Sequence, residues 1–537
     1  MLFRSQRAPR AELSLDERLA RYIVEGSKDG LIDDLALKLQ EATPLEIING
    51  PLMKGMDEVG RLFNNNELIV AEVLQSAEAM KAAVAYLEQF MEKTESAKKG
   101  RILLATVKGD VHDIGKNLVE IVLSNNGYEV IDLGIKVPPS DLLQAIRTYR
   151  PDIIGLSGLL VKSAQQMVVT AEELSAAGEC PPMLVGGAAL SNSFTRRKIA
   201  PAYKGLVAYA EDAMKGLELA NQIMDPEKRR QLEARLAEED RRLGAGAGRG
   251  EAPKAPGSRR SSRVPALEEV PRPPDFERHV LRNINLDEVW AYINPAMLYS
   301  RHLGLRGGRA EKLLAEGDEK ALMLKALIDE LKEECRRGAM QVHAVWQFFE
   351  ACSEGNRLHL LEAGTGRVLH TFEFPRQPGE DGLCLADYVN PAGEGPRDSV
   401  CLFVVTAGGG IRELYEQYKA AGEFLRSHAI QALALETAEG CAEWLHSKIR
   451  GWWGFPDDPE MTMKDRFQAR YRGRRYSFGY PACPDLAMQQ ALFDLLRPEE
   501  IGVSLTEEFM MEPEASVSAI VVHHPEAEYF SVGKEQL

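Results

Sequence analysis

The chain has little cysteine, no long apolar run and a deficit of positive charge, and each shortage excludes a class of protein. None of its seven cysteines belongs to a Cys-x-x-Cys pair: Cys180, Cys335, Cys352, Cys384, Cys401, Cys441 and Cys483. An odd, scattered set argues against a disulfide framework or a zinc ribbon and favours a reducing compartment. No apolar run approaches the ~20 residues of a membrane span. The net charge of −16, from 65 basic and 81 acidic residues, argues against a general nucleic-acid binder, since phosphate contacts need a basic face.

What remains is an ordinary globular composition. The 537 residues are 45% hydrophobic and 27% charged, which leaves room for several domains. The first ten residues, Met1 to Arg10, contain no apolar core of signal-peptide length. We therefore expect a cytoplasmic protein with neither nucleic acid nor a membrane among its partners.

Residues 14–95 are expected to be helical. Ser14 with Glu17 and Thr43 with Glu46 have the spacing of capping boxes, and Pro44 follows the second cap. Apolar residues then recur every three or four positions: Val70, Val73, Leu74, Ala77, Met80, Val84, Leu87 and Met91. The pattern predicts a four-helix bundle.

Residues 99–225 alternate between apolar runs and helical stretches. Strands are predicted near 101–107, 128–133, 152–157, 182–186 and 206–209. A helical stretch follows each of them, which is typical of a doubly wound, flavodoxin-like parallel sheet.

The remaining chain changes character twice. Residues 226–275 begin with a charged helical stretch that ends at Gly244 and continue with Gly, Pro, Ser and Arg, which predicts a flexible linker that need not pack. Residues 276–537 are predicted to be α+β. Helices are expected near 286–302, 309–336, 411–450 and 484–496, and strand-like runs near 357–361, 367–373, 400–406 and 517–522. The fold class is thus multidomain α/β and α+β.

One histidine follows the first predicted strand directly. His112 lies two residues after Asp110 and three before Gly115. A carboxylate at this spacing can fix the imidazole tautomer, as around many metal-ligating histidines, and a glycine lets the backbone pass close to a ligand. A solvated loop histidine is the alternative reading of the hexapeptide alone.

Two later strands also end in unusual loops. Ser157, Leu159 and Ser163 follow the third strand, and Gly186 and Gly187 end the fourth. Ligands of open parallel sheets bind outside these carboxyl ends. Ordinary turn chemistry is the alternative, since serine and glycine are common in loops.

Together, Asp-x-His-x-x-Gly, Ser-x-Leu and Gly-Gly in this order resemble the cobalamin-binding module of the cobalamin-dependent methionine synthase family and its corrinoid-protein relatives. The resemblance implies that His112 binds the cobalt of cobalamin, which carries the methyl group as methylcobalamin. It also implies that Asp110 and Ser163 complete a catalytic relay with His112. Proton uptake by this relay would accompany reduction or release of the ligand. It implies these cobalamin contacts: Gly109, Asp110, Val111, His112, Asp113, Gly115, Ser157, Leu159, Val161, Gly186, Gly187 and Ala213. Val161 departs from the family, where threonine is common.

The same resemblance gives the helical region a role as a cap over cobalamin. Phe63, Val70 and Val73 align with the residues that shield the methyl group, although their spacing alone favours plain core packing. Asn49 falls where the family often has a cofactor-contacting glutamate.

A second motif lies near the end of the chain. Arg475-x-x-x-Gly479-Tyr480-Pro-Ala-Cys-Pro484 alone describes a rigid loop. It also resembles the signature of the reactivation domain of the same family, which binds S-adenosylmethionine. The resemblance implies that Arg475 holds the S-adenosylmethionine carboxylate. The other implied lining residues are Asn294, Glu439, Tyr480, Tyr529 and Phe530; Asn294 stands where one branch of the family has aspartate.

The resemblance therefore implies the cobalamin-carrying and reactivating part of a methionine synthase, a methyltransferase of methionine biosynthesis. Homocysteine- and methyltetrahydrofolate-binding modules, the former with its own zinc, are expected in trans or on a longer chain. A flavodoxin-like or ferredoxin-like protein is the expected electron donor. The alternatives are a corrinoid carrier for another methyl-transfer system, a cobalamin-responsive regulatory protein, and a flavodoxin-like domain with an accidental histidine.

Overall fold

The computed structural model describes residues 13–91, 98–188, 190–245, 259–379 and 381–533. Parts of the expected cap and linker, residues 92–95 and 246–258, lie outside these ranges. The chain forms two compact units. Unit 1 comprises Met1–Gly246, Pro295–Leu331 and Arg412–Ala432, and unit 2 comprises Ala247–Asn294, Lys332–Ile411 and Leu433–Leu537. No helix in the described ranges is both long and apolar enough to cross a bilayer.

Unit 1 begins with a helical region. Its helices are α1 (Leu15–Glu25), α2 (Leu31–Lys38), α3 (Pro44–Ile47), α4 (Met53–Asn64) and α5 (Val70–Leu87). Both predicted capping boxes are confirmed. The Glu17 carboxylate accepts a hydrogen bond from the Ser14 N–H, and the Glu46 carboxylate accepts one from the Thr43 N–H. A π-turn over Ile48–Leu52 joins α3 to α4 and accommodates Pro51, which cannot donate a helical hydrogen bond.

The five-stranded parallel sheet of unit 1 has the order β2-β1-β3-β4-β5. Its strands are β1 (Gly100–Thr106), β2 (Tyr128–Asp132), β3 (Ile153–Ser157), β4 (Met183–Gly186) and β5 (Val207–Tyr209). Every predicted strand agrees with an observed one within two residues. The order is that of a flavodoxin-like doubly wound sheet, as predicted.

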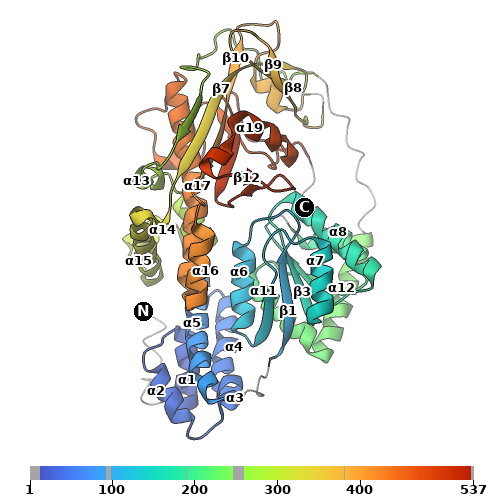
Figure 1. Cartoon of the computed structure of the whole chain (residues 1–537), viewed down its shortest axis with the longest axis vertical. Coiled ribbons are helices and arrows are strands. Elements are labelled where there is room, and N and C mark those ends of the chain that lie inside the picture. The colour runs from blue at the N-terminus through green and yellow to red at the C-terminus, as the bar shows by residue number, and fades with distance from the viewer. Residues whose placement is uncertain (1–12, 92–97, 189, 246–258, 380, 534–537) are drawn as a thin grey trace. The chain divides into compact units, whose positions relative to one another are not determined.

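Helices cover both faces of this sheet (Figure 1). They are α6 (Ile114–Ser124), α7 (Pro139–Tyr149), α8 (Val161–Ala177), α9 (Asn192–Phe194), α10 (Ala200–Ala202), α11 (Ala213–Met224) and α12 (Pro226–Ala245). One buried cluster joins the sheet to α6 and α11, and a second joins it to α7 and α8. The two clusters hold the sheet between two layers of helices, and the predicted motifs lie in the loops at the carboxyl ends of its strands.

Four further helical elements belong to unit 1 wholly or in part. They are α14 (Ala310–Ala315), α15 (Glu319–Glu334), α16 (Ile411–Ala421) and the first turns of α17 (Phe424–Trp452), besides a π-helical turn over Ala296–His302. The predicted helix over 286–302 is interrupted, because Asn294 precedes Pro295 and a residue before proline avoids the α conformation.

Unit 2 contains a seven-stranded antiparallel sheet of order β11-β14-β10-β7-β8-β9, with β6 paired to β7. Its strands are β6 (Arg278–Leu281), β7 (His343–Glu354), β8 (Arg357–Leu361), β9 (Val368–Glu373), β10 (Asp398–Thr406), β11 (Arg474–Tyr476) and β14 (Ser516–Val522). The hairpin β12 (Ser504–Leu505) and β13 (Met511–Glu512) and the helices α13 (Leu286–Trp290), α18 (Met463–Phe467) and α19 (Gln489–Leu496) complete it with most of α17. The predicted α+β class is confirmed.

The structure differs from the predicted flexible linker over residues 226–275. The expected helical stretch is present as α12, residues 226–245, but it packs on the domain: Leu232 and Leu236 are buried in the cluster beside α11. Within residues 259–275, Ser261 and Val264 are buried in unit 2. The composition misled because a few apolar and hydroxyl side chains, too sparse to predict a core, suffice to dock a segment on an existing domain.

Candidate functional sites

Asp110 connects two loops at the carboxyl edge of the parallel sheet. It is fully buried, and its Oδ1 lies 2.6 Å from His112 Nδ1 and accepts the His112 N–H at 2.9 Å. Its Oδ2 accepts hydrogen bonds from Ser163 Oγ at 2.6 Å and from the Leu159 N–H at 2.8 Å. Burial raises the pKa of Asp110, but the hydrogen bonds from His112 and Ser163 outweigh it and hold the pKa below its ordinary value.

This geometry defines the chemistry of His112. The ionised Asp110 carboxylate accepts a hydrogen bond from the Nδ1–H group, which leaves Nε2 as the nitrogen that would bind a metal. The His112 side chain is 20% exposed, so the ring reaches the surface while its partner remains buried. The structure thus brings Asp110, His112 and Ser163 into direct contact.

Glycines leave room around this histidine. A Cβ on Gly115 would meet no atom within 4 Å. A Cβ on Gly187, whose φ is +145°, would lie 1.7 Å from the Gly158 carbonyl oxygen, so the β3 and β4 loops approach as only glycines allow. Gly109 likewise has a positive φ, +74°. The loops therefore form a small-residue cradle at the sheet edge, which fits a bulky planar group beside His112.

The neighbouring predicted residues divide between this cradle and the protein interior. Ser157 ends β3, Gly186 ends β4, and Val161, at the start of α8, is exposed. Val111 is buried, and Ala213 is the buried first residue of α11.

Asp113 is bound by α16 rather than by the loops. Its carboxylate accepts hydrogen bonds from Arg412 Nη1 at 2.8 Å and from the Tyr415 hydroxyl at 3.0 Å. Its side chain is therefore already occupied by protein groups.

The predicted cap residues lie in two different places. Phe63 and Val73 are buried in the cluster that α4 and α5 share with α6 and α11, and Val70 packs against it. Asn49 instead lines a hollow of about 620 Å³ with Lys98, Asn125 and Gly127, at the amino edge of the sheet. The structure does not bring Asn49 to His112, because β1 runs between the two edges.

Arg475 is the centre of the second candidate site, in unit 2. Strand β11 holds it next to α17, where its Nη2 lies 3.5 Å from Glu439 and its Nη1 lies 3.6 Å from Glu443. Burial lowers the pKa of Arg475, but the two carboxylates outweigh it and raise the pKa above its ordinary value. Nη1 is buried and forms no hydrogen bond within the described residues. A buried guanidinium with an unfilled donor is suited to a ligand carboxylate.

The loop after Arg475 presents an aromatic side chain. Gly479, with φ +84°, and Cys483 form a tight turn in which the Gly479 N–H donates to the Cys483 carbonyl at 2.8 Å. Tyr480 on this turn is 54% exposed. Burial of the hydroxyl group and the Glu439 carboxylate raise the pKa of Tyr480.

Tyr529 and Phe530 lie in an irregular segment after β14. Their rings lie 5.6 Å and 6.2 Å from the ring of Tyr476, which follows Arg475 directly. Tyr529 is 57% exposed, as a ligand-facing ring would be.

Asn294 directly follows a segment that packs on α17 beside Glu439. A Cβ on Gly440 would lie 3.1 Å from the Val289 carbonyl and 3.4 Å from the Ile293 nitrogen, so α17 packs directly on the segment before Asn294. The sequence interpretation assigned no role to Glu443, although it lies one helical turn after Glu439 and hence on the same face of α17.

Comparison with known proteins matches three family models to the chain. Residues 15–88 and 100–218 each match a B12 binding domain, and residues 286–536 match the vitamin B12 dependent methionine synthase activation domain. The chain is 39% identical to methionine synthase of Mycobacterium tuberculosis over 97% of this chain and 46% of that protein. It is 37% identical to that of Mycobacterium leprae over 98% of this chain and 47% of that protein.

The chain spans about half the length of these curated relatives. Among solved structures, the reactivation domain of MetH bound to AdoHcy matches with a TM-score of 0.46 and 26% identity, over 49% of this chain and 83% of that one. By these family models, the chain contains two B12 binding domains, over residues 15–88 and 100–218, and the activation domain of vitamin B12 dependent methionine synthase, over residues 286–536.

Proposed function

We propose that this chain carries cobalamin on His112 and restores its methyl group from S-adenosylmethionine, as the cofactor-bearing and reactivating part of a methionine synthase. The observation that carries the proposal is the buried Asp110 carboxylate, which contacts His112 Nδ1 at 2.6 Å and accepts the Ser163 hydroxyl hydrogen bond at 2.6 Å. An ordinary solvated histidine needs no such buried support.

The residues of the sheet edge fit cobalamin. When bound, cobalamin would supply a cobalt centre that accepts a methyl group and passes it on. His112 would ligate this cobalt through Nε2, and Asp110 would keep the ring in that tautomer and strengthen it as a donor. Gly115, Gly186 and Gly187 would leave space for the corrin and its tail. The other residues proposed to line the site are Gly109, Val111, Ser157, Leu159, Val161 and Ala213.

Unit 2 would hold the methyl donor. Arg475 would bind the S-adenosylmethionine carboxylate with its unfilled Nη1, and Tyr480, Tyr529 and Phe530 would flank the ligand. Glu439 and Asn294 would face its amino group. A corrinoid carrier for another methyl-transfer system would not need an activation domain, which favours the methionine synthase reading.

The complete reaction would transfer a methyl group from methyltetrahydrofolate to homocysteine. We propose that modules on a longer chain or on partner proteins bind these two substrates, that zinc belongs to the homocysteine module, and that a flavodoxin-like or ferredoxin-like protein supplies the electron for reactivation. A cytoplasmic location agrees with all three.

The direct test is His112→Ala, mixed with cobalamin and read by visible absorption. The wild-type protein should show the spectrum of a histidine-ligated cobalt, and the variant should lose it and retain less cofactor. The matched control is His359→Ala. It removes a histidine on β8 that is hydrogen-bonded to Thr371 on β9, and it should behave as wild type. An unchanged spectrum in His112→Ala would refute the ligand assignment.

A further inference from the structure

Residues 259–267, here called the strap, run across unit 2 before the region that matches the activation domain. That match begins at residue 286. Two strap residues are nevertheless buried, with Ser261 2% and Val264 1% exposed. The strap is therefore packed into unit 2, although it lies outside residues 286–536, which match the activation domain.

Asp381 fixes the strap at its centre. Its Oδ1 accepts hydrogen bonds from the Ser262 N–H at 2.6 Å and the Ser261 hydroxyl at 3.0 Å, and its Oδ2 accepts the Ser262 hydroxyl at 2.9 Å. These bonds hold the pKa of Asp381 below its ordinary value. Further along, the Leu267 N–H donates to the Asn390 side chain at 2.8 Å.

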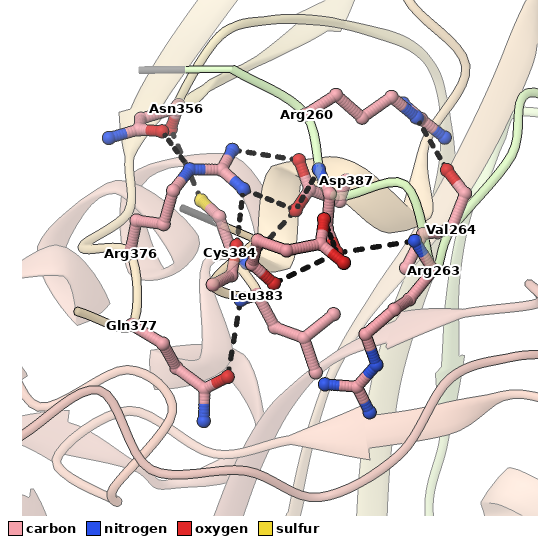
Figure 2. A network of polar contacts seen from close by, with 12 residues as sticks. Arg260, Arg263, Val264, Asn356, Arg376, Gln377, Leu383, Cys384 and Asp387 are labelled. Carbon is pink, nitrogen blue, oxygen red and sulfur yellow. Dashed lines mark hydrogen bonds and ion pairs between the residues drawn. The ribbon is translucent and has the colours of Figure 1, made fainter. Parts of the chain in front are cut away.

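Arg260 and a buried ion pair extend the anchor (Figure 2). Arg260 donates to the Val389 carbonyl at 2.7 Å and to the Val264 carbonyl at 2.8 Å. Arg376 and Asp387, both at most 1% exposed at their side chains, are joined by bonds of 2.6 Å and 2.8 Å. Figure 2 shows this pair next to the pale green strap. Asp387 of this ion pair is the residue before Tyr388 in the sequence.

The anchored strap contacts the segment that carries Tyr529 and Phe530. Arg263 forms an ion pair with Glu528, the residue before Tyr529. The Glu528 carbonyl also accepts hydrogen bonds from the Tyr476 hydroxyl at 2.6 Å and the Tyr388 hydroxyl at 3.4 Å. Residues 527–531 have no helix or strand, so these contacts hold the two rings in place together with the Gln377 Nε2 bond to the Ser531 carbonyl at 2.9 Å.

We propose that Arg263 is a positioning residue of the S-adenosylmethionine site, and that the docked strap sets the affinity of this site through Glu528. The inference rests on the proposed function and adds to it a segment that precedes the region matched to the activation domain. Arg263 does not touch the ligand; it acts through Tyr529 and Phe530.

A charge-exchange experiment on the full chain tests this pair. Calorimetric titration with S-adenosylmethionine should give a Kd raised about fivefold for Arg263→Glu and for Glu528→Arg, because each places like charges together in an exposed pair. The double exchange should return the Kd close to wild type, and Arg263→Lys should do so as well. Arg259→Ala removes an exposed strap arginine as the control and should leave the Kd unchanged.

A second variant tests the anchor. Asp381→Ala removes three hydrogen bonds of the strap and touches no predicted ligand residue, so we expect a Kd rise of about tenfold with cobalamin retention unchanged. Wild-type Kd values in all Arg263 and Asp381 variants would overturn the inference alone. Absence of S-adenosylmethionine binding in the wild-type chain would instead overturn the proposed function.

Discussion

Gly115 and Gly187 serve different purposes although they lie in the same group of loops. Gly115 is in the first turn of α6 with open space where a Cβ would be, whereas a Cβ at Gly187 would collide with the backbone at Gly158. The first glycine is thus unnecessary for the fold itself, and the second is required by it.

Gly115→Ala should therefore separate stability from ligand binding. Alanine is favoured in helices, so the free energy of unfolding should stay constant or rise by roughly 0.5 kcal/mol. Cobalamin affinity should fall, because the added methyl group occupies space beside His112. Urea unfolding and equilibrium binding measure the two effects.

The matched variant is Gly187→Ala, which should destabilise the fold by about 2–4 kcal/mol. If Gly115→Ala left cobalamin affinity intact, the cradle at the sheet edge would not be the binding site.

Asp110→Asn tests the support of His112 with almost no change in volume. The amide cannot serve as the same charged acceptor for His112 Nδ1, so the retention of cobalamin should fall about 10- to 100-fold, as when such partners of metal ligands are changed. Gel filtration with absorbance detection measures it. Asp141→Asn, an exposed carboxylate on α7, should retain cobalamin like the wild type.

At the scale of helices and strands, local pattern predicted most of unit 1. Four of the five parallel strands are short and largely apolar runs, which is a clear signal of a buried strand, whereas β2 at the edge contains Glu129 and Asp132. The longest strand of unit 2, β7 (His343–Glu354), was not predicted. It mixes apolar residues with Gln347 and Glu350 without strict alternation, and only its pairing with β6, β8 and β10 makes it a strand.

Local pattern and tertiary packing also distinguish the site residues that the sequence predicts from those that it does not. Asp110 and His112 are two residues apart, so a motif can identify them. Arg263 and Glu528 are 265 residues apart, and neither belongs to a motif. Such pairs arise only from tertiary packing, which a single sequence does not reveal.

His428 in α17 gives an element-scale prediction of pH dependence. Its Nε2 lies 2.9 Å from the His302 carbonyl, and burial lowers its pKa to about 4. In the unfolded chain a histidine has a pKa of about 6.5, so below that pH the unfolded state binds a proton that the folded state does not. The free energy of unfolding should therefore fall between pH about 6.5 and about 4, by at most ~1.4 kcal/mol per pH unit.

Urea unfolding of wild type and His428→Gln at pH about 7 and about 5 isolates this contribution. The variant should be less stable at the higher pH and should lose less stability on acidification. Equal losses in both proteins would show that His428 does not cause the acid sensitivity.

For the whole molecule, the two candidate sites lie in different compact units. Their binding functions should therefore be separable. Arg475→Ala should raise the Kd for S-adenosylmethionine at least tenfold, since a charge-assisted contact to a carboxylate is lost, and leave cobalamin retention unchanged. His112→Ala should do the reverse. Arg470→Ala, an exposed arginine paired with Asp465, is the control for charge removal. Loss of both functions in either variant would contradict separate sites.

The central claim is that His112 provides the axial nitrogen of a bound cobalamin. Electron paramagnetic resonance of the chain loaded with cob(II)alamin tests it, using protein made with ¹⁵N-histidine. Each cobalt line should change from a triplet in unlabelled protein to a doublet in labelled protein, because the coupled nitrogen belongs to the protein. A triplet that persists in labelled protein would place the cofactor's own base on cobalt and contradict the account.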